Sequence, residues 1–281
     1  MTDQLTLSTT LTPIRVLGGT GKTGARIVHR LRAAGAPVTA LGRSTPVAFD
    51  WADRSTWDRA VDGAERLYIA YSPDLAVPGA LDDIRDLTAR CRQAGVRRLV
   101  LLSGRGEPEA QEAEDVVRHS GIDWTIVRCS WFFQNFTESY LREPLVAGEL
   151  VLPTVRFPEP FVDADDIADV ATAALLDDRH VGELYELTGP ELLTFGQVAE
   201  TVADLTGREV RYVPVDRSEY VTAARADGVP EEVVSLLDYL FHVVLDGRNA
   251  SLTDGVHRAL GREPRTFLGF AREAARAGLW G

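Results

Sequence analysis

The sequence predicts an α/β fold: a doubly wound parallel sheet of Rossmann type with a smaller, mostly helical C-terminal lobe. Short β-branched or apolar runs alternate with longer amphipathic stretches through the first half of the 281 residues. Strands that alternate with helices pair in parallel through right-handed crossovers. In addition, a glycine stands where each of these helices should end. Both observations favour the same doubly wound arrangement.

The first half contains five predicted strands, at residues 14–17, 38–41, 66–70, 98–102 and 123–128. Four amphipathic stretches between them predict helices, at residues 23–34, 55–61, 81–94 and 110–119. The glycines that should end these helices are Gly35, Gly63, Gly95 and Gly121. This order of elements gives a parallel sheet covered by helices on both faces.

The second half is less regular. We expect helices at residues 131–146, 163–176 and 195–205, strands at 148–152, 183–187 and 210–214, and mainly helix from Ser218 onward. No long linker interrupts the chain. We therefore expect a disordered tail at residues 1–13, a dinucleotide-binding domain at 14–160, and a substrate lobe at 161–281 that packs on the same sheet.

Composition excludes several classes of function. The net charge of −12 disfavours binding to nucleic acid or to an anionic membrane, because both need a positive field. No apolar run is long enough to span a bilayer, and the N-terminus does not read as a secretory signal, so we expect a cytoplasmic protein. Cys91 and Cys129 form no CxxC pair, and the histidines show no ligand spacing, so no metal site is expected.

A glycine motif, Gly18-Gly19-Thr20-Gly21-Lys22-Thr23-Gly24, joins the first strand to the first helix. In this context Gly18 permits a tight turn, Gly21 lets the backbone approach a diphosphate, and Gly24 lets the helix pack against the strand. Amide groups at the helix N-terminus meet the negative charge. A P-loop is excluded because no glycine stands five residues before Gly21. The motif predicts a dinucleotide site that includes Thr20, Lys22 and Thr23.

The residue after the second strand selects the dinucleotide, since an acidic side chain there binds the ribose hydroxyl of NAD. Here Arg43 holds the position, with Ser44 beside it. A guanidinium pairs with a 2′-phosphate, and Lys22 can add charge, so NADP(H) is favoured over NAD(H). A solvated surface arginine is the alternative. Further groove residues are expected at the ends of the following segments: Asp50, Trp51, Tyr71, Ser72, Ser103 and Cys129.

Longer motifs resemble the NmrA-like, atypical short-chain dehydrogenase/reductases over nearly the whole chain. They are the glycine motif, Arg43, and the segments 98–103, 123–128, 131–136, 161–168 and 261–267. The resemblance implies a Rossmann fold and a nicotinamide dinucleotide. It leaves the reaction open, because the family includes quinone, triphenylmethane-dye and azo reductases as well as redox-sensing regulators that do not catalyse a reaction.

The usual Tyr-x-x-x-Lys pair cannot form, because Lys22 is the only lysine and Gly18 stands four residues before it. Reduction of a simple ketone is therefore disfavoured. A quinone or similar planar aromatic accepts hydride readily and depends mostly on orientation. We expect Ser103, Trp131 and Phe132 to position it. Further aromatic candidates are Phe133, Phe136 and Tyr140, with Tyr239, Phe241 and His242 as an opposing wall.

Two other functions remain open. One is an NADP(H)-sensing regulator that binds a protein partner, and the other is an epimerase or isomerase with bound cofactor. A homodimer is possible in each case. The aspartates at 163, 165 and 166 could suggest a metal cluster, but capping of the helix that begins there is favoured.

Overall fold

The computed structural model describes residues 13–281, so the tail expected at residues 1–13 lies, apart from Pro13, outside the described residues. A six-stranded sheet has the order β2-β1-β3-β4-β5-β7, and every neighbouring pair is parallel. Its strands are β1 (Ile14–Leu17), β2 (Val38–Leu41), β3 (Arg66–Ile69), β4 (Arg98–Gly104), β5 (Asp123–Cys129) and β7 (Glu183–Leu187). The predicted fold class is confirmed.

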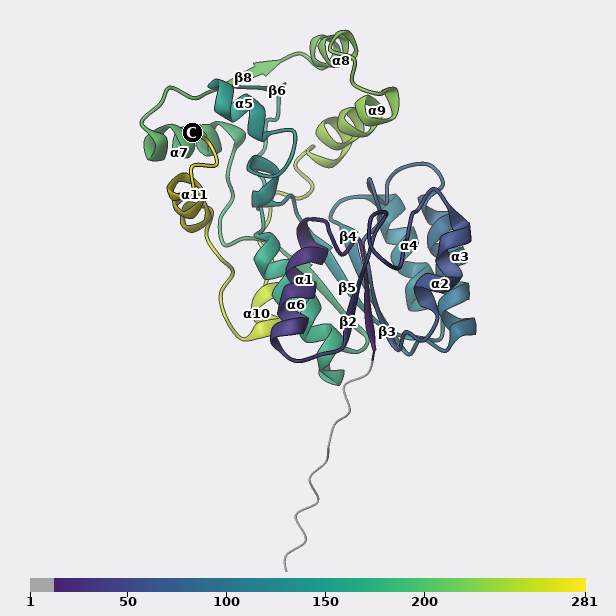
Figure 1. Ribbon diagram of the computed structural model, residues 1–281. Helices are drawn as coiled ribbons and strands as arrows, with labels where there is room; N and C mark the ends of the chain where they lie inside the picture. The colour runs from purple at the N-terminus through teal and green to yellow at the C-terminus, as the bar shows by residue number, and fades with distance from the viewer. Residues whose placement is uncertain (1–12) are drawn as a thin grey trace, which may run out of the picture.

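Helices cover both faces of this sheet (Figure 1). One face carries α1 (Lys22–Ala33), α6 (Ala164–Leu176) and α10 (Gly255–Leu260). The other carries α2 (Trp57–Val61), α3 (Ala80–Ala94) and α4 (Pro108–Arg118), and a short 3-10 turn at Arg54–Thr56 precedes α2. Two apolar cores form, because successive strand residues point to opposite faces: Val100 enters one core and Leu101 the other.

A lobe stands above the carboxyl ends of the strands (Figure 1). It contains α5 (Arg142–Ala147), α7 (Phe195–Thr206), α8 (Arg217–Ala226), α9 (Glu231–Tyr239), α11 (Phe267–Arg276) and the parallel pair β6 (Glu149–Pro153) and β8 (Arg211–Val215). A π-helical turn, Leu240–Val244, continues α9. Phe133, Phe136 and Phe195 are among the residues of a third core inside the lobe.

The helix predicted at residues 131–146 is wrong over most of its length. A 3-10 turn at Phe133–Phe136 follows β5, and α5 begins only at Arg142. Here the chain pairs with residue 162 instead: the Phe133 amide donates to the Val162 carbonyl at 2.9 Å, and the Val162 amide donates to the Trp131 carbonyl at 2.8 Å. Tertiary pairing thus replaces the intrahelical hydrogen bonds at the start of this segment.

Within residues 13–281, no helix has the length and apolar character needed to cross a membrane.

Candidate active site

The glycine loop packs tightly between β1 and α1. Gly18 adopts φ +67°, and a side-chain carbon at Gly24 would overlap the Gly18 carbonyl. Gly19, which sequence reasoning left without a role, faces Ala40 of β2, and an added Cβ would lie 2.8 Å from the Ala40 Cβ. No side chain caps α1 in the described residues, so its first amides are free to face an anion.

Thr23 and Lys22 follow the loop in different directions. The Thr23 hydroxyl oxygen accepts a hydrogen bond from the buried Tyr68 hydroxyl at 2.9 Å, so this side chain points into the sheet. Lys22 Nζ donates to the Asn135 amide oxygen at 3.1 Å, beside Glu138. Burial lowers the pKa of Lys22, although the charge of Glu138 opposes this shift. Lys22 therefore joins the glycine loop to the segment that follows β5.

Arg43 and Ser44 are exposed beyond the carboxyl end of β2. Arg43 has no hydrogen bond or ion pair with any residue between 13 and 281. Thr20 of the glycine loop lies beside this position, because a Cβ on Gly42 would meet the Thr20 hydroxyl at 3.3 Å. The fold thus brings the glycine loop and an unpaired guanidinium to the same edge of the sheet.

An aromatic cluster, formed by Phe49, Trp51, Trp57 and Tyr71, borders the next part of this edge. The Trp51 and Tyr71 rings lie 4.5 Å apart, and Trp51 Nε1 donates to the Ala70 carbonyl at 3.1 Å. The Tyr71 hydroxyl donates to Asp83 at 2.8 Å. The carboxylate of Asp50 accepts from the Ala52 amide in a local turn, and Ser72 is exposed. The rings of Trp51 and Tyr71 are therefore in contact, whereas the Asp50 carboxylate forms a hydrogen bond within its own loop.

Ser103 and Cys129 lie at the carboxyl ends of β4 and β5, and both are buried. The Ser103 hydroxyl donates to Glu114 at 2.6 Å, and Glu114 in turn accepts from Arg128 Nε at 2.8 Å. Burial raises the pKa of Cys129 well above its ordinary value. Because the Ser103 hydroxyl donates its proton to Glu114, this hydroxyl is not a free proton donor.

A polar network that the sequence analysis missed continues from Arg128. Arg128 contacts Glu186 of β7 at 3.4 Å, and Glu186 accepts from Arg105 Nε at 2.6 Å. Arg105 also donates to the Asn249 carbonyl at 2.6 Å and to Ser251. The network ties the carboxyl ends of β4, β5 and β7 to the loop that precedes α10. Charged residues near the ends of three strands were the signal available in the sequence.

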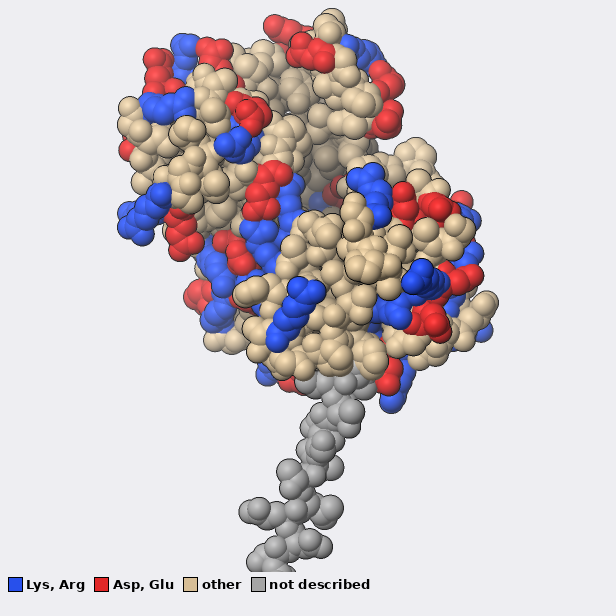
Figure 2. All heavy atoms as spheres, viewed as in Figure 1, with Lys and Arg blue, Asp and Glu red and all other residues tan. Residues whose placement is uncertain are grey.

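Trp131 and Phe132 are half-buried between sheet and lobe. The Trp131 ring lies 5.3 Å from Phe241 and 6.0 Å from Phe195, and Phe132 pairs with Val162. Phe133 and Phe136 belong to the lobe core, while the Tyr239 hydroxyl donates to Glu109 at 2.6 Å. Figure 2 shows a recess between the lobe and the sheet with its helices, lined by uncharged residues on the lobe side.

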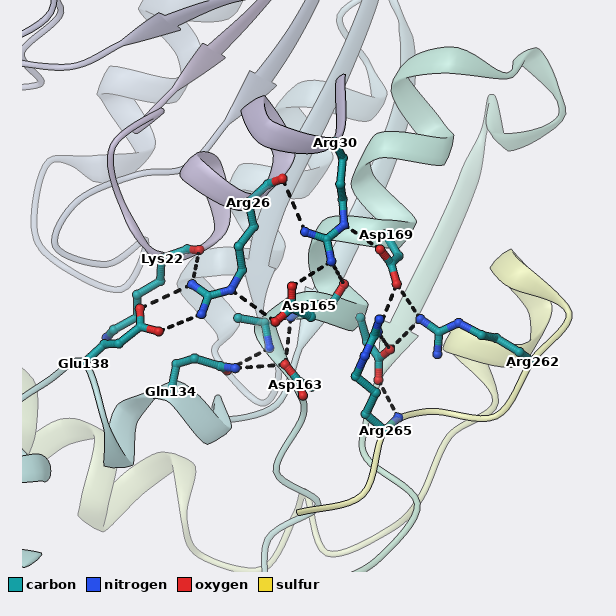
Figure 3. A network of polar contacts seen from close by, with 12 residues as sticks. Lys22, Arg26, Arg30, Gln134, Glu138, Asp163, Asp165, Asp169, Arg262 and Arg265 are labelled. Carbon is teal, nitrogen blue, oxygen red and sulfur yellow. Dashed lines mark hydrogen bonds and ion pairs between the residues drawn. The ribbon is translucent and has the colours of Figure 1, made fainter. Parts of the chain in front are cut away.

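Salt bridges hold α1 to α6 and to the lobe (Figure 3). Arg26 pairs with Glu138 at 2.6 Å and with Asp165 at 3.4 Å, and Arg30 pairs with Asp165 at 2.6 Å. Asp163 caps α6 by accepting from the Asp165 amide at 2.8 Å, which confirms the capping prediction. The aspartates at the start of α6 therefore cap this helix and form ion pairs with arginines of α1. These ion pairs hold α1 against α6.

Glu159 is a buried acid that the sequence analysis did not single out. Glu159 is 3% exposed, and its Oε1 has no hydrogen-bond partner among residues 13–281. Burial raises the pKa of Glu159 from 4.5 to about 7, although the charge of Arg105 opposes the shift. At pH values between 4.5 and about 7, Glu159 is ionised in the unfolded chain and protonated in the folded protein, so folding takes up a proton.

We expect Glu159→Gln to be more stable than the wild type at pH 8 by up to about 3 kcal/mol, because glutamine cannot ionise. The wild-type protein loses stability as pH rises from 4.5 through about 7, since only the unfolded state releases the proton freely. The difference should vanish below pH 4.5. Urea unfolding at pH 4, 6 and 8 measures it. A constant difference across that range would show that Glu159 is not a buried neutral acid.

Comparison with known proteins agrees with this geometry. Residues 18–178 match the family described as NAD(P)H-binding, and residues 109–267 match the NmrA-like family. An NAD(P)H azoreductase from Xenophilus azovorans is 30% identical, over 94% of this chain and 98% of its own length. The resemblance expected from the sequence motifs is confirmed.

Two solved structures share the fold. The NADPH-dependent quinone oxidoreductase of Escherichia coli, complexed with NADPH, has a TM-score of 0.79 and 20% identity, covering 92% of this chain and 99% of that one. The triphenylmethane reductase of Citrobacter, complexed with NADP(H), has a TM-score of 0.77 and 19% identity, covering 94% and 99%. At these identities the likeness concerns the fold alone.

Proposed function

Since the chain belongs to the NmrA-like family of NAD(P)H-binding oxidoreductases, we propose that it is an NADPH-dependent reductase of quinones or other planar aromatic acceptors. One observation carries the cofactor part: the N-terminus of α1 and Arg43 lie at the same edge of the sheet, and within residues 13–281 no side chain caps the helix or pairs with Arg43. The amides suit a diphosphate, and the guanidinium suits the 2′-phosphate.

The residues present fit the whole dinucleotide. The glycine loop leaves no room for side chains at Gly19 and Gly24, because it packs closely on β2 and on the start of α1, as a dinucleotide-binding loop does. Arg43 and Ser44 would hold the adenosine end, and Tyr71, Ser72 and Cys129 would border the groove toward the nicotinamide. When bound, the reduced nicotinamide supplies a hydride. The chain itself supplies orientation, through Trp131 and Phe132 at the end of β5.

Three observations support a planar aromatic acceptor: the missing Tyr-x-x-x-Lys pair, the aromatic residues after β5, and the names of the related reductases. Lys22 is the only lysine and lies in the glycine loop, so no Tyr-x-x-x-Lys pair is available to protonate an alkoxide. The half-buried Trp131 ring lies 5.3 Å from the buried Phe241 ring, and such an aromatic surface suits a flat apolar molecule. The names of the azoreductase, quinone oxidoreductase and triphenylmethane reductase point to conjugated acceptors as well.

The test is NADPH oxidation, followed by absorbance, with a panel of benzoquinones, naphthoquinones and azo dyes. We expect turnover with at least one quinone, and a lower KM for NADPH than for NADH. A protein that binds NADPH tightly and reduces nothing in the panel would contradict the proposal and would favour the dinucleotide-sensing alternative. Failure to bind either dinucleotide would refute both.

Arg43→Ala is expected to weaken NADPH binding by about 30-fold, which corresponds to the loss of a charged hydrogen bond of about 2 kcal/mol. The affinity for NADH, which lacks the 2′-phosphate, should change little. Calorimetric titration with both dinucleotides measures the two affinities. Arg272→Ala, an exposed arginine of α11, is the matched control. An equal loss for NADH and NADPH would show that Arg43 does not read the phosphate.

A further inference from the structure

Reduction of a quinone needs a proton as well as a hydride. Most of the acidic groups near the carboxyl ends of the strands already donate their proton in a hydrogen bond to another residue. Ser103 donates to Glu114, Tyr68 to Thr23, Tyr71 to Asp83 and Tyr239 to Glu109. Burial and the adjacent, hydrogen-bonded Asp74 raise the pKa of Glu107 to about 9. Each of these groups would have to break an existing hydrogen bond before it could donate a proton to a substrate.

Glu159 differs from all of them. Its Oε1 is the one buried carboxyl oxygen in the described residues that has no partner. The charge of Arg105 acts on it, but Arg105 already donates to Glu186, Asn249 and Ser251. A buried polar atom without a partner requires an explanation, since most buried polar atoms are hydrogen-bonded. A ligand oxygen would provide the missing partner.

The backbone places Glu159 three residues before Val162, which pairs with the segment that carries Trp131 and Phe132. The Glu159 amide donates to the Leu193 carbonyl at 2.9 Å, and its carbonyl accepts from the Leu193 amide at 3.0 Å, so its position is fixed. Three residues later, Val162 pairs with Phe132 and hydrogen-bonds to the Trp131 carbonyl at 2.8 Å. The same chain segment thus carries the acid and flanks the two aromatic residues after β5. Arg105, which follows β4, approaches from the sheet.

We propose that Glu159 is the proton donor of the reduction. This inference rests on the proposed function. The protonated carboxyl group hydrogen-bonds to a carbonyl oxygen of the quinone. The quinone gains a hydride, with its electron pair, from the reduced nicotinamide and a proton from Glu159, and it leaves as the hydroquinone. The Glu159 carboxylate then regains a proton from water, and the oxidised dinucleotide leaves.

Glu159→Gln separates this role from packing, because glutamine keeps the shape and lacks the proton. For a quinone acceptor we expect kcat to fall by about 100-fold, the usual scale of general acid catalysis. The wild-type kcat should decline above about pH 7, whereas the variant should show no such decline. Glu159→Asp should recover part of the rate together with the pH dependence. Glu200→Gln, on the exposed side of α7, is the control.

A second acceptor distinguishes proton donation from other losses. A cationic triarylmethane dye becomes neutral when it takes up hydride and needs no proton. We therefore expect Glu159→Gln to reduce such a dye at the wild-type rate and to bind NADPH with unchanged affinity. Equal loss with dye and quinone, or a wild-type quinone rate and pH profile, would overturn the role of Glu159 alone. A wild-type protein that binds NADPH and reduces neither acceptor would refute the proposed function, and the role of Glu159 with it.

Discussion

Gly24→Ala should abolish NADPH binding and destabilise the protein. The added Cβ would overlap the backbone carbonyl of Gly18, and it would lie 2.9 Å from the Gly19 Cα. These are backbone atoms, so a side-chain rotation cannot relieve the overlap. Either α1 moves away from the loop or the loop opens, and both displace the amides proposed to face the diphosphate. We expect the Kd for NADPH to rise more than 100-fold, and overpacking to cost about 1–3 kcal/mol of stability.

Alanine substitutions at two other glycines, where an added Cβ has more room, should have smaller effects on NADPH binding than Gly24→Ala. Gly196 lies in the first turn of α7, and an added Cβ would find its nearest neighbour at 3.7 Å, an ordinary contact. Gly196→Ala should therefore leave binding unchanged and raise stability by about 0.5–1 kcal/mol. Gly21→Ala should fall between, since its Cβ would meet the Gly18 carbonyl at 3.3 Å. Isothermal titration and urea unfolding give both quantities. A Gly24→Ala protein that binds NADPH normally would contradict the close-packed loop.

The sheet could be predicted from sequence because parallel strands covered on both faces are apolar throughout and are separated by amphipathic helices. The same reasoning failed after β5. The aromatic residues of segment 131–136 divide between the lobe core and the sheet edge, and the backbone pairs with residue 162, so no local periodicity describes them. Local pattern cannot report a partner that lies 30 residues away.

The candidate site shows the same division. The glycine loop could be predicted because its requirements are local: a turn, a close approach and a helix start. Ser103 could be placed at the end of β4, but not the commitment of its hydroxyl to Glu114, which depends on how α4 packs. Glu159 carried no signal, since an isolated glutamate between prolines is ordinary in a surface loop. Its burial becomes visible only when β4, β5 and the segment before α6 are assembled.

Asp166 closes the network that joins α6 to the segment before α11. Its side chain is fully buried, and it accepts from Arg262 at 2.6 Å, from the Arg265 amide at 2.7 Å and from the Arg265 guanidinium. Asp169 extends the network to Arg30 of α1 at 2.5 Å. Burial alone would raise the pKa of Asp169, but hydrogen bonds from Arg30 and Arg265 hold it below its ordinary value. One acidic helix face therefore anchors both α1 and the C-terminal segment.

Asp166→Ala is expected to cost about 2–3 kcal/mol of stability, because the hydrogen bonds of a fully buried carboxylate are lost, although Asp169 still pairs with both arginines. The Arg265 amide also loses its acceptor, which should loosen α11 and the lobe core on which it packs. Asp115→Ala is the contrasting control: Asp115 pairs with Arg118 at 3.4 Å on the surface, and its loss should cost less than about 1 kcal/mol.

Urea unfolding of both variants, with hydrogen exchange of α11, separates the two cases. In Asp166→Ala we expect faster exchange in α11 and little change in β1–β4, because the sheet keeps its own apolar cores. NADPH affinity should fall less than in Gly24→Ala, since the glycine loop itself is untouched. Equal stability of the Asp166 and Asp115 variants would show that the buried carboxylate does not anchor the C-terminal segment and that apolar packing of α11 alone holds it in place.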